Sequence, residues 1–202
     1  AMVKEEKKAL RHRVRQELTR VSVHELRRAS VAMTDRLTGL EAWRRAAAIL
    51  AFNSMPAEIE TGGILNRALS DGKRLGLPRI AGRKLEFHEW SGRADDLERG
   101  PMGIYEPSTA TPLIDRGGSE GPAPAPGLVL LVAPGLAFGR DGTRLGRAGG
   151  FYDRYLSAGR GDLLAIGLCL DRFLFDSVPT DAHDEPVDAV ITETRTIAIR
   201  TL

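Results

Sequence analysis

The stretch "LVLLVAPGLAFGRDGTRLGRAGGFYDRY", residues 128–155, joins an unbroken run of aliphatic residues to a glycine-rich segment. The aliphatic run, 128–133, is followed by Pro-Gly and predicts a buried strand. After a turn at Asp141–Gly142, a helix is expected to begin near Gly150. A buried strand that leads through a loop into a helix is typical of proteins with a parallel α/β sheet.

The rest of the chain repeats this alternation of strands and helices. Apolar residues at helical spacing predict a helix over 4–20 with a basic edge, and a third helix is expected over 58–69. Between them, the capping box formed by Ser22 and Glu25 starts a second helix that ends about Gly39. Further strands are expected at 46–52, 73–78, 84–90, 163–169, 188–193 and 196–200. The pattern predicts an α/β sandwich with a largely parallel sheet.

Length and composition favour one globular, cytoplasmic domain. The 202 residues suit a single domain, 1–202, with basic N-terminal helices at 4–40 and a Pro-, Gly- and Ser-rich excursion loop at 108–127. No apolar run approaches the ~20 residues that span a bilayer, and the charged start lacks a signal-peptide core. The single cysteine, Cys169, excludes an intrachain disulfide. We therefore expect a cytoplasmic protein without a membrane anchor.

Positive charge is concentrated at the front of the chain. Residues 1–45 contain 12 basic and 6 acidic residues, a net charge of +6, while the remainder carries −4. Three interpretations stay open at this point: a solvated amphipathic helix, a surface for a phosphate-bearing small ligand, and a nucleic-acid-binding arm. Residues 1–42 contain no Phe, Trp or Tyr that would stack on bases, which disfavours the last.

The glycine-rich segment has the composition of a phosphate-binding loop. Gly146, Gly149 and Gly150 precede an expected helix and would let backbone N–H groups approach an anion, while Arg144 and Arg147 would add charge-assisted bonds. The segment lacks both the Walker A ending and the GxGxxG fingerprint. From these residues alone, a phosphate site and a purely structural turn are both open.

Two carboxylates are candidate magnesium ligands. Asp153 stands in the first turn of the expected helix, where it would either bind a metal beside the phosphates or compensate the helix dipole. Asp184 is a second candidate, and the adjacent His183 is the one histidine close to a candidate site. No histidine pair has zinc-ligand spacing, and Cys169 within an apolar strand is expected in the core.

Several ordered landmarks resemble the 5-formyltetrahydrofolate cyclo-ligase family. The segment "PGLAFGRDGTRLGRAGGFYDRYL" is similar to the signature of that family. The other landmarks are Lys7-x-x-Leu10-Arg11, "SMPAEIET" at 54–61, "LPR" at 77–79, "GIYEP" at 103–107 and "VPTDAHDEPVDAVITE" at 178–193. Because they occur in order across nearly the whole chain, they are more specific than the glycine-rich turn alone.

The resemblance implies a fold and an activity. The expected fold is a three-layer α/β/α sandwich with a largely parallel sheet, related to sugar-phosphate isomerases and CoA transferases. The expected reaction converts 5-formyltetrahydrofolate to 5,10-methenyltetrahydrofolate with ATP and Mg²⁺, releasing ADP and phosphate. Such a reaction needs phosphate-positioning groups rather than a protein nucleophile. The implied partners are folate and ATP, without nucleic acid or membrane, in a monomer or weak homodimer.

The resemblance also implies residue roles. Catalytic roles fall to Arg144, Arg147 and Tyr152. The ATP site would comprise Lys7, Arg11, Arg144, Leu145, Gly146, Arg147, Ala148, Gly149, Gly150, Phe151 and Tyr152. Folate would be bound by Asn53, Glu58, Arg147, Gly149, Gly150 and Phe151, with Glu58 on the pterin. Magnesium would be held by Asp153 and Asp184. Glu58 as an ordinary first-turn helix acid is the alternative.

Three positions depart from the family pattern. Gly139 stands where the family usually has Asp, Ala148 replaces the middle glycine of the loop, and Phe173 replaces a usual Gln. If position 148 requires positive φ, alanine costs roughly 1–2 kcal/mol there. Asp141 is a candidate substitute for the missing acid. The departures motivate a second hypothesis, a weakened or inactive paralogue that binds nucleotide or folate.

Overall fold

A seven-stranded sheet forms the centre of the protein, as a computed structural model shows for residues 2–114 and 127–202. Its strands are β1 (Ala48–Leu50), β2 (Arg74–Ala81), β3 (Lys84–Glu89), β6 (Val129–Ala133), β9 (Leu163–Leu168), β11 (Ala189–Ile191) and β12 (Thr196–Ala198). Their order is β12-β11-β9-β6-β1-β2-β3. The five inner strands are parallel, and the edge strands β3 and β12 pair antiparallel with their neighbours. The expected largely parallel sheet is confirmed.

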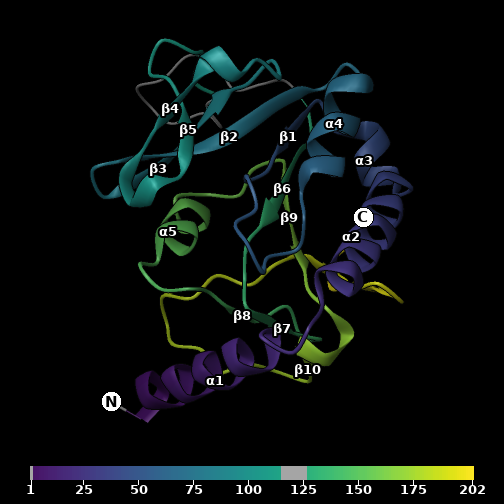
Figure 1. Ribbon diagram of the computed structural model, residues 1–202, viewed down its shortest axis with the longest axis vertical. Coiled ribbons are helices and arrows are strands. Elements are labelled where there is room, and N and C mark those ends of the chain that lie inside the picture. The colour runs from purple at the N-terminus through teal and green to yellow at the C-terminus, as the bar shows by residue number, and fades with distance from the viewer. Residues whose placement is uncertain (1, 115–126) are drawn as a thin grey trace.

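Helices cover both faces of this sheet (Figure 1). On one side lie α2 (Val23–Thr38), α3 (Glu41–Arg45) and α4 (Gly62–Ser70), and on the other lies α5 (Phe151–Ser157). The first helix, α1 (Met2–Leu18), crosses the end of the molecule next to the small strands β7, β8 and β10. The three-layer α/β/α arrangement is therefore present, with a thin layer on the side of α5.

The core follows from the apolar patterns of these elements. All five residues of β6 are buried, as the continuous aliphatic run requires of a strand covered on both faces. From the helices, Met33, Leu37 and Ile64 pack into the same cluster. Fully burying each such side chain contributes about 1.5–3 kcal/mol. The cluster holds the central strands in place. Segments that line a cavity continue from the C-terminal ends of two of these strands, β1 and β6.

Aromatic contacts attach α5 to the edge of the sheet. The ring of Phe87 on β3 lies 6.3 Å from that of Tyr152 and 5.0 Å from that of Tyr155, both measured between centroids. The first pair is edge-to-face and the second tilted, the arrangements that ring quadrupoles favour. Since α5 directly follows the glycine-rich loop, this packing also anchors the end of that loop.

Short strands complete the structure. A three-stranded sheet contains β7 (Ala137–Gly139), β8 (Arg144–Leu145) and β10 (Leu174–Phe175), and a hairpin contains β4 (Leu97–Arg99) and β5 (Tyr105–Pro107). The single-turn 3₁₀ helices are η1 (Ala94–Asp96), η2 (Pro101–Gly103) and η3 (Asp171–Phe173). The expected Asp141–Gly142 turn joins β7 to β8, with Gly142 at a φ of +89°.

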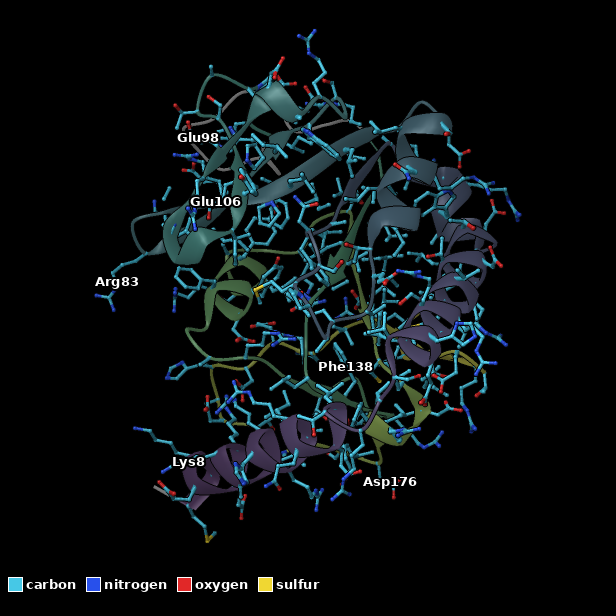
Figure 2. All side chains as sticks on the ribbon, viewed as in Figure 1. Lys8, Arg83, Glu98, Glu106, Phe138 and Asp176 are labelled. Atoms are coloured by element: carbon cyan, nitrogen blue, oxygen red, sulfur yellow. The ribbon has the colours of Figure 1, made fainter. Side chains whose placement is uncertain are left out.

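Phe138, at the centre of Figure 2, packs the small sheet against the main one. A Cβ at Gly167 on β9 would lie 2.3 Å from this ring, so glycine is required for the close approach. The contact places the β7–β8 hairpin near the C-terminal end of β9. The residues that follow β8 are thereby held next to the ends of the central strands.

Most expected elements are confirmed, with boundaries that differ by up to four residues. Ser22 Oγ accepts the N–H of Glu25 at 3.0 Å, so the helix cap is as predicted. The third helix begins at Gly62 rather than at residue 58, because residues 54–61 form a loop in which the hydroxyl of Thr61 donates to the Phe52 carbonyl. Glu58 is therefore not a helix residue. Within the expected 108–127 loop, residues 115–126 lie outside the described part of the chain.

None of the helices in the described part of the chain has both the length and the apolar character needed to cross a membrane. The expectation of a single domain stays a prediction.

Candidate functional site

A cavity of about 270 Å³ opens where β1 and β6 end. After β1 the chain continues into Phe52 and Asn53, and after β6 into Pro134, and all three residues line the cavity. The other walls come from α1, from the 55–58 segment, from β2 and β3, from the start of β5 and the residue before it, from residues 144–153 and from Asp184. Ligands of open α/β sheets bind beyond the C-terminal strand ends, which is where this cavity lies.

The residues that the sequence singled out as a site all line this one cavity. They are Lys7, Arg11, Asn53, Glu58, Arg144, Leu145, Gly146, Arg147, Ala148, Gly149, Gly150, Phe151, Tyr152, Asp153 and Asp184. They come from four separate parts of the chain, 7–11, 53–58, 144–153 and 184, and the fold brings them together. Their roles as ligands of a nucleotide, a folate or a metal stay predictions.

The first helix holds the glycine-rich loop by its backbone. Arg11 Nε donates to the carbonyl oxygen of Gly146 at 2.8 Å, and Arg15 Nη2 donates to that of Arg147 at 3.4 Å. The next three residues all have positive φ: +125° at Ala148, +89° at Gly149 and +62° at Gly150. A run of left-handed residues reverses the chain and starts α5, which is the reason for the two glycines.

Arg144 is the most buried cation of the loop. Its side chain donates from Nη1 to the Pro134 carbonyl at 3.1 Å and from Nη2 to Asp153 Oδ1 at 2.6 Å. Its Cζ lies 5.9 Å from the ring centroid of Tyr152. Burial raises the pKa of the Tyr152 hydroxyl, and the charge of Arg144 only partly opposes this. Tyr152 is therefore a neutral phenol, able to donate a hydrogen bond, at physiological pH.

Lys7 forms a cluster with two carboxylates from the segment that follows β10. Its Nζ lies 2.6 Å from Asp181 Oδ2 and also bonds to Asp184 Oδ2. Burial alone would lower the pKa of the Lys7 ammonium, but the two hydrogen bonds together raise that pKa above its ordinary value. The same bond from Lys7 lowers the pKa of the Asp181 carboxyl. Lys7 is consequently a buried group at the cavity wall that is charged at physiological pH.

Glu58 and Arg147 form a pair inside the cavity. Arg147 Nε lies 2.7 Å from Glu58 Oε1, and Glu58 Oε2 accepts the N–H of Met55 at 2.6 Å. Only 8% of Glu58 is exposed. A buried carboxylate that forms an ion pair with an arginine and accepts one backbone N–H is well suited to exchange the arginine for a ligand N–H. The pair also joins the segment expected to bind folate to the loop expected to bind ATP.

Asp153 and Asp184, the two expected magnesium ligands, both line the cavity. The N–H of Glu185 donates to Asp153 Oδ1 at 3.1 Å, which brings the two aspartate segments together. Among the described residues, the hydrogen bonds go to Oδ1 of Asp153 and to Oδ2 of Asp184. The described chain contains no group of three or more His, Cys, Asp or Glu side chains suited to a metal. Mg²⁺ usually takes one or two carboxylates and completes its shell with phosphate and water, so the pair fits.

Comparison with known proteins gives the family. The sequence profile of the 5-formyltetrahydrofolate cyclo-ligase family matches residues 3–193. The chain belongs to the 5-formyltetrahydrofolate cyclo-ligase family. Among its relatives, a probable 5-formyltetrahydrofolate cyclo-ligase of Schizosaccharomyces pombe is 25% identical, covering 95% of this chain and 97% of that protein. The 5-formyltetrahydrofolate cyclo-ligase of Mus musculus is 28% identical, covering 93% of each chain.

A solved structure shares the fold. The NMR structure of Aquifex aeolicus 5,10-methenyltetrahydrofolate synthetase matches with a TM-score of 0.81 and 27% identity. The match covers 96% of this chain and 93% of that one. The expected family and fold class are therefore both confirmed.

The three departures from the cyclo-ligase pattern have distinct surroundings. Ala148 adopts a φ of +125°, which is strained for any residue with a Cβ. At Gly139 a Cβ would lie 2.2 Å from both Asp141 Oδ1 and Thr143 Oγ1. Asp141 accepts from the N–H and hydroxyl of Thr143, so its carboxylate organises the β7–β8 turn and is not among the cavity residues. Phe173 is buried in the core.

Further residues of the cavity escaped the sequence-based assignment. Tyr105 and Glu106 belong to the landmark "GIYEP" but received no role, although both line the cavity. Tyr105 is 59% exposed and Glu106 only 4%. Burial raises the pKa of the Glu106 carboxyl, because neither the N–H of Ile80 nor the charge of Arg79 compensates its desolvation. Within the described chain, Glu106 Oε2 has no hydrogen-bond partner.

Cys169 is buried, as expected, and burial raises the pKa of its thiol. A thiol in this environment is a poor nucleophile, so the expectation of a core cysteine is supported by its surroundings.

Proposed function

We propose that this protein is an ATP-dependent 5-formyltetrahydrofolate cyclo-ligase that forms 5,10-methenyltetrahydrofolate, ADP and phosphate. The observation that carries the proposal is the single cavity lined by every residue to which the family pattern gives a role. The match of the family over residues 3–193 supports the same conclusion. Both the nucleotide and the magnesium dependence are part of the proposal.

The reaction requires the formyl oxygen to become a leaving group. The formyl oxygen attacks the γ-phosphorus, an O–P bond forms, and the bond from that phosphorus to ADP breaks. N10 then attacks the activated formyl carbon and loses its proton, while the C–O bond breaks and phosphate leaves. The protein contributes orientation and charge stabilisation to these steps, as is general for phosphoryl transfer.

The cations at the α1 end of the cavity are suited to the phosphates. Lys7 and Arg11 approach from α1, and Arg144 is held rigidly between Pro134 and Asp153. Donors that are fixed before the reaction stabilise developing charge without reorganising, which makes Arg144 the best candidate to stabilise the transferred phosphoryl group. The neutral hydroxyl of Tyr152 would add a hydrogen bond, also as a donor.

Folate recognition is assigned to the Glu58 side of the cavity. The carboxylate of Glu58 would accept N–H groups from the amino-pyrimidinone edge of the pterin, and Arg147 would turn from Glu58 towards the formyl phosphate. Asn53, Gly149, Gly150 and Phe151 line the same cavity and would contact the rest of the substrate. This arrangement places the loop of residues 144–152 between the two substrates.

Asp153 and Asp184 would hold Mg²⁺, which would supply positive charge to offset that of the phosphates. The compartment expected is the cytoplasm, and a monomer or a weak homodimer without nucleic-acid partners remains the expected state.

A turnover assay tests the proposal. Purified protein with 5-formyltetrahydrofolate, ATP and Mg²⁺ should develop the absorbance of the methenyl product, and omission of ATP should abolish it. Lys7→Ala should lower the rate, whereas Lys8→Ala, an exposed neighbour on α1 that points away from the body in Figure 2, should not. Absence of any ATP-dependent product at high protein concentration would contradict the proposal.

The strained φ of Ala148 favours one alternative, a paralogue that binds nucleotide or folate without turnover. Such a protein would give calorimetric binding of ATP or of the folate but no product. The same preparation should therefore be used for both measurements, so that a folded but inactive protein is recognised.

A further inference from the structure

The end of the cavity at α1 is electrically balanced. Three cations face it, namely Lys7, Arg11 and Arg144, and three carboxylates accompany them, namely Asp153, Asp181 and Asp184. Arg144 is paired with Asp153, and Lys7 is shared by the other two aspartates. A polyanion that enters this end therefore meets cations whose charges are already offset by neighbouring carboxylates.

Asp181 differs from the other two carboxylates because it does not line the cavity. Its Oδ2 lies 2.6 Å from Lys7 Nζ, and its side chain is 49% exposed. Asp184, by contrast, lines the cavity and has a side chain only 16% exposed. Asp181 thus adds a negative charge to the phosphate end without supplying a group that could contact phosphate or metal.

This surplus carboxylate has a consequence for the charge of the ligand. Mg²⁺ removes two charges from a nucleoside triphosphate, so the metal-free nucleotide has about twice the negative charge of the complex and is repelled about twice as strongly by a fixed carboxylate. The Lys7 ammonium, bonded to Asp181, is also less free to turn towards phosphate. Both effects penalise the metal-free nucleotide more than its magnesium complex.

We propose that Asp181 is a specificity-determining residue that makes nucleotide binding depend on a divalent cation, by offsetting the charge of Lys7 from outside the cavity. The inference rests on the proposed function, because it requires a triphosphate at the α1 end. Asp181 would thus control the metal dependence of nucleotide binding, whereas Asp153 and Asp184 would hold the metal and the glycine-rich loop would bind the phosphates.

The variant Asp181→Asn isolates the charge from the structural bonds of this residue. Asp181 Oδ1 accepts the N–H of His183 at 3.0 Å, and asparagine retains an oxygen for that bond. The backbone N–H of Asp181, which donates to Asp184 Oδ2 at 2.7 Å, is unaffected by the change. The turn that carries Asp184 is therefore preserved while one negative charge is removed.

The matched control is Asp176→Asn. Asp176 belongs to the same connection between β10 and β11, is fully exposed, and lies 3.7 Å from Arg140, remote from the labelled Lys8 of α1 in Figure 2. The control changes the net charge of the protein by the same amount as Asp181→Asn. It separates a local effect at Lys7 from a general effect of net charge.

The experiment is titration calorimetry with ATP alone, without folate, in buffer with EDTA and in buffer with Mg²⁺. For Asp181→Asn we expect the dissociation constant of metal-free ATP to fall about five-fold and that of the magnesium complex about two-fold, the size typical of one partly exposed charge. Asp176→Asn should leave both constants unchanged. All three proteins should unfold in one cooperative transition above the temperature of the titration, which would show that the fold is intact, with Asp181→Asn melting lower because it loses its ion pair with Lys7.

The outcomes separate this inference from the proposed function. The deciding quantity is the dissociation constant of metal-free ATP divided by that of the magnesium complex. If wild-type protein binds the magnesium complex and Asp181→Asn leaves this ratio unchanged, or weakens the binding of both forms equally, the inference is overturned. The proposed function still stands in that case. If wild-type protein binds no nucleotide in either buffer, the proposed function fails and the inference fails with it. A reduced ratio in Asp181→Asn alone supports the inference.

Discussion

Arg147 Nε lies 2.7 Å from Oε1 of Glu58, which couples the glycine-rich loop to the loop that follows β1. Because Glu58 is buried, the ion pair with Arg147 and the bond from the N–H of Met55 replace contacts that its carboxylate would make with water. In the proposed reaction Glu58 exchanges Arg147 for the pterin, so that folate binding releases the arginine towards the phosphoryl group. The pair would then link the arrival of one substrate to the handling of the other.

Glu58→Gln should impair folate binding more than ATP binding. The amide retains an acceptor for Met55 but loses the charge that attracts N–H donors, so we expect kcat/KM for the folate to fall roughly 10- to 100-fold. The dissociation constant of ATP measured without folate should change little. Glu60→Gln is the control, since its side chain is 41% exposed and lies 3.5 Å from Arg27. Equal loss of affinity for both substrates would contradict the assignment.

Arg144→Lys should lower kcat with a smaller effect on substrate binding. Lysine cannot reproduce the two bonds that Arg144 makes, to Pro134 and to Asp153, so the cation loses its fixed position. Removing one such preorganised donor typically costs about 10²-fold or more in kcat. Steady-state kinetics with both substrates would measure the effect.

The comparison for this variant is Arg140→Lys. Arg140 lies in the same β7–β8 hairpin, but its side chain is 44% exposed and 3.7 Å from Asp176. It should retain full activity. A kcat of Arg144→Lys within a factor of about two of wild type would remove Arg144 from the catalytic roles.

Ala148→Gly should stabilise the protein. Alanine at a φ of +125° costs about 1–3 kcal/mol, and glycine removes this strain while adding about 0.5–1 kcal/mol of chain entropy to the unfolded state. We therefore expect a net gain of about 1 kcal/mol in the free energy of unfolding, measured by urea denaturation. If the strained residue also displaces the loop, affinity for ATP should rise in the same variant.

The control for loop strain is Ala57→Gly. Ala57 has a φ of +66° and lies outside the loop of residues 144–152, so its replacement should also stabilise the protein without changing ATP affinity. Loss of stability in Ala148→Gly would show that Ala148 is not strained. If Ala148→Gly leaves the affinity for ATP unchanged, the alanine at position 148, where the family usually has glycine, affects stability alone.

The sequence could predict the main sheet because its signals are local. The aliphatic run of β6 and the cap at Ser22 each specify an element without reference to the rest of the chain. The candidate site residues came from the resemblance to the cyclo-ligase family, whose landmarks occur in order along the chain. The short strands β7, β8 and β10 were not predicted individually, since two or three residues cannot display an alternating pattern.

What the sequence could not supply are contacts across long chain distances. The bond between Lys7 and Asp181 depends on how α1 crosses the segment before β11, and nothing near either residue specifies it. Glu106 is a similar case. The landmark "GIYEP" identifies its position, but burial without a full set of hydrogen bonds arises only when β5 packs beside β2.

Glu106→Gln should make the protein more stable at neutral pH. Burial raises the pKa of the Glu106 carboxyl above its value of about 4.3 in an unfolded chain. For a group with a raised pKa in the folded state, its contribution to stability is fully present below the unfolded pKa and is lost as pH rises through the folded pKa. The neutral amide avoids the cost of burying a charge at pH 7, so the variant should gain stability there.

The pH dependence distinguishes this explanation from a simple packing effect. The advantage of Glu106→Gln over wild type, measured by urea denaturation, should shrink as pH falls towards about 4, where the wild-type carboxyl is protonated in both states. Glu98→Gln is the matched variant. Glu98 lies on β4, the strand next to β5, is half-exposed, and forms an ion pair with Arg79 at 2.5 Å. It should not gain stability at pH 7. If the advantage of Glu106→Gln were constant between pH 4 and pH 7, it could not come from the ionisation of this carboxyl.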